Sequence, residues 1–222
     1  MTELNFGIDD AGRGPVIGPM VLAGCMLDKK TEQELAKLGV KDSKQLTQRR
    51  REFLASIIKK KAIAYDIQMV SPDKIDSSKA KGLKLNELEA NIAAKIIDKI
   101  NPKNKQISVF LDCPSTSIVN WRNYLLTKIK YLKNLKIICE HKADVNHVSV
   151  AAASILAKCK REEEVNKLKK EYGEEIGSGY PSDPLTKKFL EKNIEKYENK
   201  NLFRKTWETY KKAKQNSEQS TL

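Results

Sequence analysis

The sequence predicts an α/β fold built on a mixed β-sheet. Short apolar segments rich in β-branched residues alternate along the chain with longer segments whose apolar residues recur at helical spacing. Two apolar segments within residues 4–27 are joined by a short turn, which indicates an antiparallel pair inside that sheet. With 222 residues, of which 40% are hydrophobic, the chain can bury a sizeable core in one or two domains.

Each predicted strand is bounded by polar or turn-forming residues. The strands span 4–9, 16–27, 62–70, Ile107–Asp112 and Leu135–Glu140. The helix predicted at 86–100 places apolar residues at Leu88, Ile92 and Ile96, along one face. The other predicted helices are 47–58, 115–132, Val148–Tyr172, 185–197 and 203–214.

The chain is strongly basic, with 42 Lys and Arg against 29 Asp and Glu and a formal net charge of +13. This balance favours a polyanionic partner, most simply nucleic acid, although solvated lysine-rich helices would give the same composition. The longest uncharged segment, 15–27, has 13 residues and contains proline and glycine, so we expect no membrane span. The first residues lack a secretory-signal pattern and the four cysteines form no C-x-x-C pair. We therefore expect a soluble, cytoplasmic protein with reduced thiols.

Several carboxylates stand at the ends of predicted strands. Asp9 and Asp10 end the first strand, Asp112 ends the fourth, and Asp144 follows the fifth. Strand ends of α/β sheets are where side chains converge on ligands, although a single Asp can simply begin a turn. Four together predict a cluster. Because like charges ~4 Å apart repel by ~4 kcal/mol at an effective dielectric of about 20, such a cluster needs cations or shared protons.

The chemistry of these carboxylates selects hard divalent ions, Mg²⁺ or Mn²⁺. Two such ions ~4 Å apart commonly serve in-line displacement at phosphorus. A basic protein with an acidic, magnesium-suited cluster is therefore typical of an enzyme that cleaves phosphodiesters or transfers phosphoryl groups. The motif G-x-x-x-x-G-K-[ST] is absent from the sequence, which argues against an NTPase.

A Gly-Arg-Gly turn at residues 12–14 follows the first strand. With Gly18 it superficially resembles a dinucleotide-binding fingerprint, but Pro15 interrupts the loop, the third glycine comes one residue late and a strand follows. The turn instead offers backbone N–H groups and a guanidinium to a phosphate or a sugar.

Seven segments occur in the order typical of type 2 ribonucleases H. They read GIDDAGRG (7–14), DSKQL (42–46), LNELEA (85–90), FLDCP (110–114), KAD (142–144), AASILAK (152–158) and GSGYPSD (177–183). The chain resembles the archaeal members of the ribonuclease HII family over about residues 7–210.

The resemblance implies an RNase H-like fold, with a mixed five-stranded sheet flanked by helices and a helical C-terminal extension. We expect the catalytic core at 1–180, the extension at 181–214 and a flexible tail at 215–222. The implied activity is that of an endoribonuclease. It would cleave the RNA strand of RNA–DNA hybrids and cut on the 5′ side of ribonucleotides embedded in duplex DNA, by two-metal hydrolysis that leaves a 3′-hydroxyl and a 5′-phosphate.

The resemblance also implies roles for individual residues. Four carboxylates would carry catalysis and hold two Mg²⁺ or Mn²⁺ ions: Asp9, Asp10, Asp112 and Asp144. The turn residues that would contact the ribonucleotide's 2′-hydroxyl and its phosphate are Gly12, Arg13 and Gly14. Tyr180 would pack on the sugar that follows the cut, although it could simply anchor its loop. The residues expected at the phosphate backbone are Ser43, Lys44, Ser154 and Lys158. Ser43 could equally cap a helix, and Ser154 could serve close packing.

Two features depart from the family pattern. The family usually has Glu at the position of Asp10. Adjacent residues of a regular strand point to opposite faces, so Asp9 and Asp10 can reach one site only if the strand breaks here, and we expect Ala11–Gly12 to supply that break. The tail, which ends Gln219-Ser-Thr-Leu222, lacks the glutamine with paired aromatics of a clamp-binding peptide. We therefore expect a monomer that binds hybrid and ribonucleotide-containing duplexes but neither a sliding clamp nor a membrane.

Two other functions stay open. One is a catalytically weakened hybrid-binding protein, which the Asp10 change allows and which Asp112 and Asp144 argue against. The other is a DNA nuclease or resolvase on the same fold, which the Gly-Arg-Gly turn and Tyr180 disfavour.

Overall fold

A computed structural model describes residues 4–40 and 46–219 of the chain. It divides into two compact units. The first comprises 1–11, 21–68 and 86–160, and the second comprises 12–20, 69–85 and 161–222. The domain division expected near residue 180 stays a prediction. Within the described ranges, none of the helices has the length and hydropathy that crossing a bilayer requires.

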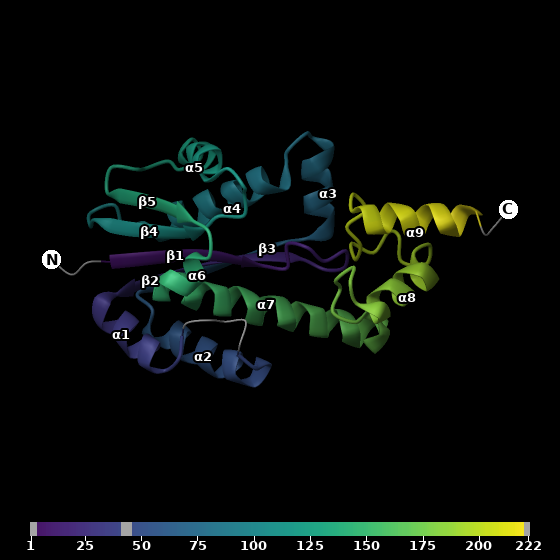
Figure 1. Cartoon of the computed structure of the whole chain (residues 1–222), viewed down its shortest axis with the longest axis horizontal. Coiled ribbons are helices and arrows are strands. Elements are labelled where there is room, and N and C mark those ends of the chain that lie inside the picture. Colours follow the sequence, from purple (N-terminus) through teal and green to yellow (C-terminus); the bar gives the residue numbers. More distant parts are fainter. Residues whose placement is uncertain (1–3, 41–45, 220–222) are drawn as a thin grey trace. The chain divides into compact units, whose positions relative to one another are not determined.

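Most of a five-stranded mixed sheet lies in the first unit, in the order β3-β2-β1-β4-β5. Its strands are β1 (Leu4–Ala11), β2 (Met20–Asp28), β3 (Ala64–Val70), β4 (Ile107–Asp112) and β5 (Leu135–Glu140). β1 pairs antiparallel with β2 and parallel with β4, which in turn pairs parallel with β5. The C-terminal ends of β1, β4 and β5 therefore lie at one edge of the sheet (Figure 1). The predicted mixed α/β fold is confirmed.

The turn between β1 and β2 is longer than the sequence indicated. β1 continues to Ala11, past the expected end at Asp9, and β2 begins at Met20 rather than at residue 16. Residues 12–19 form the loop between them, in which Gly12 (φ 79°) and Gly18 (φ 83°) adopt the left-handed conformation that favours glycine. Ile17 makes only an isolated bridge to Phe203.

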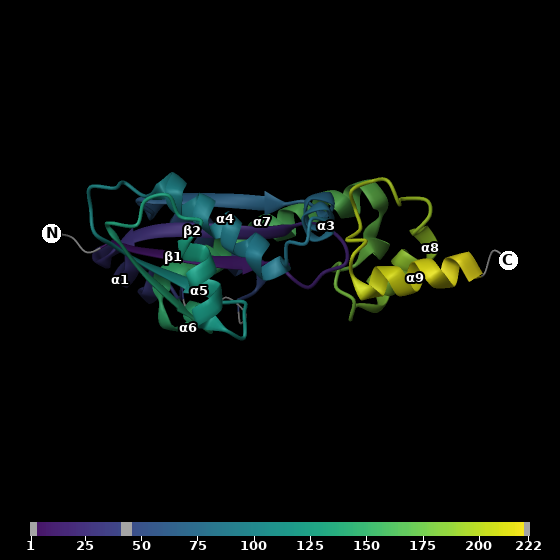
Figure 2. The ribbon, with the colours of Figure 1, turned by 90° about the horizontal axis from the view of Figure 1, so that it is seen from above.

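Helices cover both faces of the sheet (Figure 1). One face is covered by α4 (Leu85–Ile100) and α5 (Ile118–Leu126), which lie in front of the strands in Figure 2. The other is covered by α1 (Lys29–Lys37), α2 (Gln48–Lys61) and the first half of α7 (Val148–Tyr172). α5 ends six residues earlier than expected, and α1 was not predicted, although Asp28 caps it by accepting a hydrogen bond from the Thr31 N–H (2.7 Å).

The core beneath β1 and β2 positions α7. Its buried residues include Val21 and Leu27 of β2, Leu54 of α2 and Ile155 of α7. A Cβ at Gly7 of β1 would overlap the backbone at the start of α7, so only glycine permits this close approach. α7 is thereby held against the strand that carries Asp9.

The second unit is mostly helical. It contains α3 (Pro72–Ala80), the second half of α7, a short 3₁₀ turn (Glu174–Ile176), α8 (Pro184–Asn193) and α9 (Glu208–Gln219). Val16, Ile17, Phe189, Phe203 and Tyr210 form its core. α3 was not predicted, although Ser71 and Pro72 supply an ordinary N-cap and first helical residue. α9 begins five residues later than expected.

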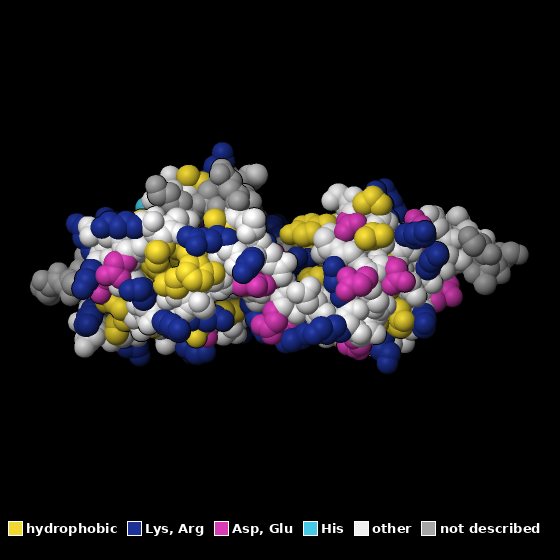
Figure 3. All heavy atoms as spheres, turned by 90° about the horizontal axis from the view of Figure 1, so that it is seen from below, with side chains coloured by type: hydrophobic (Ala, Val, Ile, Leu, Met, Phe, Trp, Pro, Cys, Tyr) yellow, Lys and Arg dark blue, Asp and Glu magenta, His cyan; other side chains and the backbone are white. Residues whose placement is uncertain are grey.

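Charged side chains of both signs are mixed on one face of the protein. On the face in Figure 3, lysine and arginine side chains are interspersed with aspartate and glutamate. The net charge of +13 therefore does not by itself mark a binding face.

Candidate active site

Three of the predicted carboxylates meet at the C-terminal ends of β1 and β4. Asp9 and Asp10 are consecutive in β1, and Asp112 is the last residue of β4. The parallel ladder between these strands ends at Ile8 and Leu111, so the carboxylates stand just beyond the last paired residues. Asp9 is 8% exposed, and its Oδ1 accepts a hydrogen bond from the Asp10 N–H (2.7 Å).

The electrostatics of Asp9 show an excess of negative charge at this edge. Burial raises the pKa of Asp9 to about 8, and the charges of Asp10 and Asp112 act in the same direction. Hydrogen bonds from the Ser154 hydroxyl and the Asp10 N–H lower the pKa but do not offset burial. A cation at this position would relieve the repulsion and favour the ionised carboxylate.

β1 stays regular through both carboxylates. Asp9 pairs with Ala23 and Asp10 with Leu22 of β2, so the strand runs past Asp9 and ends at Ala11, where the break at Ala11–Gly12 was expected. A small cavity beside β1 is lined by Asp9, Asp10, Asp112 and Glu89. The sequence reading missed Glu89, a 2% exposed carboxylate of α4. Glu89 lies in the segment LNELEA (85–90) that carries the family resemblance, but no role was assigned to it there.

Asp144 lies in the short helix α6 (Ala143–Asn146) and is 4% exposed. Lys142, two residues before Asp144, adopts a left-handed conformation (φ 58°), which is uncommon outside glycine and often marks functional turns. The Ala143 N–H donates to Asp112 Oδ1 (3.0 Å). This hydrogen bond ties the helix that carries Asp144 to the carboxylate at the end of β4.

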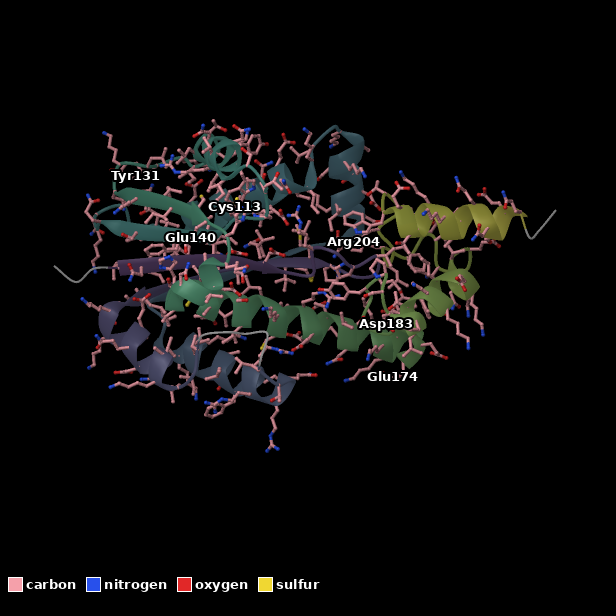
Figure 4. The ribbon with its side chains drawn as sticks, in the orientation of Figure 1. Cys113, Tyr131, Glu140, Glu174, Asp183 and Arg204 are labelled. Atoms are coloured by element: carbon pink, nitrogen blue, oxygen red, sulfur yellow. The ribbon has the colours of Figure 1, made fainter. Side chains whose placement is uncertain are left out.

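Glu140 braces the segment that follows β5. Figure 4 shows Glu140 and Cys113 near the ends of β5 and β4, where the Cys113 N–H donates to the Glu140 carbonyl (2.9 Å). Glu140 Oε1 accepts from Asn146 Nδ2 (2.9 Å) and lies 3.0 Å from His147 Nε2. The His147 ring stacks on Phe110 of β4 with a centroid distance of 3.8 Å. These contacts fix the turn between α6 and α7.

The donor set suits a hydrated divalent ion. Among residues 4–40 and 46–219, no three His, Cys, Asp or Glu side chains are arranged to enclose a metal ion by themselves. Mg²⁺ is usually held through one or two carboxylates and several waters, so a closed protein cage is not required. The buried, charge-crowded Asp9 beside Asp10 and Asp112 fits such an ion.

Ser154 and Lys158 lie one turn apart on α7. Ser154 is fully buried, its hydroxyl hydrogen-bonds Asp9, and Lys158 Nζ donates to Ser154 Oγ (3.0 Å). Ser154 therefore supports a carboxylate, and contact of either residue with a phosphate stays a prediction. Ser43 and Lys44 lie outside the described residues.

A buried arginine holds the Gly-Arg-Gly turn in the second unit. Arg204 is fully buried and donates Nη2 to the Gly12 carbonyl (2.6 Å), Nη1 to the Arg13 carbonyl (2.8 Å) and Nε to the Gly18 carbonyl (3.0 Å). Its guanidinium carbon lies 5.1 Å from the centroid of the Trp207 ring. Three carbonyls of one loop are thus fixed by one planar cation. Sequence reading missed Arg204, because no local pattern distinguishes it from the other basic residues.

Tyr180 and the Gly-Arg-Gly turn come together. A Cβ on Gly14 would lie 3.6 Å from Tyr180 Cε1, so the ring borders the turn. Arg161 sits 5.0 Å from the centroid of the Tyr180 ring, donates Nη2 to the Ser178 carbonyl (2.9 Å) and would overlap a Cβ at Gly12. The loop that carries Tyr180 is therefore packed beside the turn predicted to read the ribose.

The family model for ribonuclease HII matches residues 6–210 of this chain. The chain belongs to the ribonuclease HII family. Ribonuclease HII of Methanocaldococcus jannaschii is 39% identical over 98% of this chain and 97% of its own. The crystal structure of ribonuclease H2 from Pyrococcus horikoshii matches with a TM-score of 0.85 at 38% identity, over 97% of this chain and 99% of that chain. Both the expected RNase H-like fold and the expected class of enzyme, an endoribonuclease, are confirmed.

The prediction that no sliding clamp binds is contradicted by a solved relative. We expected no sliding clamp, because the tail after Gln219 lacks paired aromatics. A solved ribonuclease HII from Archaeoglobus fulgidus is in complex with PCNA; it is 38% identical with a TM-score of 0.80, over 92% of this chain and 95% of that chain. A family member this similar binds a clamp, so the tail is no ground for excluding one. Residues 220–222 of the tail lie outside the described residues.

Proposed function

We propose that this ribonuclease HII cleaves the RNA strand of RNA–DNA hybrids and cuts on the 5′ side of ribonucleotides embedded in duplex DNA. The products carry a 3′-hydroxyl and a 5′-phosphate. The observation that carries the proposal is the burial of Asp9 beside Asp10 and Asp112. Burial and these two charges raise the pKa of Asp9 to about 8, and bound cations would stabilise the ionised carboxylates.

The carboxylates Asp9, Asp10, Asp112 and Asp144 hold two Mg²⁺ or Mn²⁺ ions in this proposal. When bound, the ions supply an activated water and stabilise the leaving 3′-oxygen. Asp9 gives up its proton as the site fills, and the Ser154 hydroxyl keeps its carboxylate oriented. The Ala143 N–H does the same for Asp112.

In this proposal the Gly-Arg-Gly turn recognises the ribose. Gly12 and Gly14 let the backbone approach the sugar closely, and Arg13 faces the adjoining phosphate. Because Arg204 occupies the Gly12 and Arg13 carbonyls, the turn presents its N–H groups rather than its acceptors. The 2′-hydroxyl is the group that separates RNA from DNA, and Tyr180 packs on the next sugar, where it favours deoxyribose.

The remaining assignments are contacts along the phosphate backbone by Ser43, Lys44, Ser154 and Lys158. We place the enzyme in the cytoplasm, where it would meet DNA that contains ribonucleotides.

The test is cleavage of an end-labelled RNA–DNA hybrid with Mg²⁺ or Mn²⁺ against EDTA, together with an all-DNA duplex. We expect metal-dependent cutting of the RNA strand alone. Asp112→Asn should abolish cutting, whereas Asp98→Asn, an Asp in the same unit outside the carboxylate cluster, should cut like the parent. Hybrid binding without cleavage would favour the weakened binding protein, and comparable cutting of all-DNA duplex would favour the DNA nuclease.

A further inference from the structure

A second groove opens at the opposite end of the sheet from the carboxylates. It has a volume of about 790 Å³ and is formed by the segments that lead into β4 and β5. Tyr131, which lines it, lies at the end of these strands away from Cys113 and Glu140 (Figure 4). Ile107 at the start of β4 lines the groove and is roughly 17 Å from Asp112 along the strand, at about 3.3 Å per residue.

The lining of this groove is basic and rich in hydrogen-bond donors. Four exposed lysines contribute to it: Lys103, Lys105, Lys133 and Lys136. The amide side chains in the lining are those of Asn104, Gln106 and Asn134. No Asp or Glu lines the groove, and none of the four lysines forms an ion pair with any residue in 4–40 or 46–219. This differs from the mixed charges of the face in Figure 3.

A buried amide pair fixes the two segments that carry the lysines. Asn134 Nδ2 donates to Asn101 Oδ1 (2.8 Å), and Asn101 Nδ2 donates to Asn134 Oδ1 (3.2 Å). Asn134 Nδ2 also donates to the Lys105 carbonyl (2.7 Å), and Asn101 Nδ2 donates to the Tyr131 carbonyl (3.3 Å). Both asparagines are buried. The segments 101–106 and 131–136 are therefore held at a set spacing, and the groove is preorganised.

The backbone at Lys103 is held in an unusual conformation. Its φ is 62°, in the left-handed region that a lysine rarely adopts. Asn101 Oδ1 accepts from the Lys103 N–H (2.9 Å), and the Asn104 N–H donates to the Pro102 carbonyl (2.8 Å). Lys103 Nζ lies 5.8 Å from the centroid of the Tyr131 ring. Conformations of this kind often persist at ligand sites.

We propose that this groove binds the phosphodiester backbone of nucleic acid, at a second site that is separate from the carboxylates and takes no part in cleavage. Lysines bind phosphates as point charges, and the side-chain amides of Asn104 and Gln106 add neutral N–H donors. The lysines are spread over the segments before β4 and β5 and over β5 itself, an arrangement that matches a row of phosphates better than one compact anion. Such a site would hold duplex DNA independently of the presence of a ribonucleotide.

The first test measures binding of an all-DNA duplex in EDTA over a range of salt concentrations. Replacing Lys105, Lys133 and Lys136 by Gln should reduce the magnitude of the log–log salt slope by about 0.9 for each lost contact. The matched control replaces three exposed lysines of the same unit, Lys59, Lys60 and Lys95, by Gln. It removes the same charge and should leave the slope nearly unchanged. Equal slopes for the two triple variants would overturn the proposal.

The second test locates the ligand by amide NMR with the full chain in EDTA. Titration of the all-DNA duplex should shift the backbone amides of 103–108 and 131–136 at micromolar duplex. Tripolyphosphate at equal phosphate concentration should shift them less, because it spans fewer lysines. If tripolyphosphate shifts them as strongly, the groove is a site for small phosphate compounds and the nucleic-acid assignment is wrong. Unshifted amides with either probe would also overturn it. Both tests use DNA that the enzyme is not expected to cut, so their outcome is independent of the proposed cleavage.

Discussion

The guanidinium of Arg204 donates to the Arg13 carbonyl at 2.8 Å and to the Gly12 carbonyl at 2.6 Å. Two arginines far apart in sequence therefore have opposite roles in the second unit. Arg204 is fully buried and shapes the turn, whereas the partly exposed Arg13 is presented by that turn. The substitutions of these two residues should consequently affect different properties.

Arg204→Ala should destabilise the protein. It leaves three carbonyls without a donor, and each unsatisfied buried group costs about 1–3 kcal/mol. We expect the free energy of unfolding to fall by about 3 kcal/mol or more, measured by denaturant unfolding. Arg204→Lys should recover only part of the lost free energy of unfolding, because an ammonium group cannot place three donors in one plane. Unchanged stability of Arg204→Ala would contradict the role of Arg204 in holding the turn.

Arg13→Ala should leave stability within about 0.5 kcal/mol of the parent, because Arg13 is only partly buried and the proposed function places it at the substrate rather than in the core. The kcat/KM for a duplex with one ribonucleotide should drop by at least tenfold, a loss of about 1.4 kcal/mol of transition-state binding. Arg13→Lys should keep part of the activity. Normal cleavage by the alanine variant would show that the turn does not read the substrate through this side chain.

Asp10 occupies the position at which the resemblance to the family leads us to expect Glu. Asp10→Asn should reduce activity by about 100-fold or more, since small misplacements in such sites have effects of that size. Asp10→Glu should retain or raise activity, most clearly at low metal concentration, because the longer side chain reaches around the regular strand more easily. A Mg²⁺ titration of both variants provides the measurement. If Asp10→Asn follows the parent throughout, the site has three essential carboxylates and Asp10 is not among them.

The raised pKa of Asp9 predicts how the stability of the metal-free protein depends on pH. The pKa moves from 3.8 to about 8, so between these values the folded protein retains a proton that the unfolded chain has released. The contribution of Asp9 to stability is therefore complete below pH ~4 and is lost as the pH rises to about 8.

Thermal or urea unfolding in EDTA from pH 4 to pH 8 measures this effect. Relative to Asp9→Asn, the parent should lose at most about 1.4 kcal/mol of stability per pH unit. Mg²⁺ should restore stability to the parent at pH 8 but not to the variant. Parallel curves for the two proteins in EDTA would mean that Asp9 is not perturbed.

Much of the fold could be predicted from the distribution of apolar residues. β4, β5 and α7 have the predicted bounds: the two strands are short apolar segments bounded by polar residues, and α7 begins with small apolar residues and ends with charged ones. β2 could not be placed correctly, since Val16 and Ile17 are as apolar as a strand but pack in the second unit's core. Tertiary packing decided their position, and no local signal distinguishes the two cases.

The carboxylates of the candidate site could be predicted from the sequence, but the residues that hold the neighbouring segments in place could not. Asp112 could be identified because a carboxylate ended an apolar strand. Arg161 and Arg204 donate hydrogen bonds to segments distant in sequence, and a single sequence carries no pattern for such contacts. Glu89 meets the other carboxylates only at the cavity that they line together. Ser154 was predicted only in part: it lies in a recognised motif, but its hydrogen bond to Asp9 is seen only in the structure.

The most direct test compares two duplexes that differ by a single 2′-hydroxyl. One carries a ribonucleotide at one position of an otherwise all-DNA strand, and the other carries the corresponding deoxyribonucleotide. With Mg²⁺ or Mn²⁺, we predict one cut on the 5′ side of the ribonucleotide, leaving a 3′-hydroxyl and a 5′-phosphate, and no cut in the deoxy duplex or in EDTA. Comparable cutting of both duplexes, or metal-independent cutting, would contradict the proposed function.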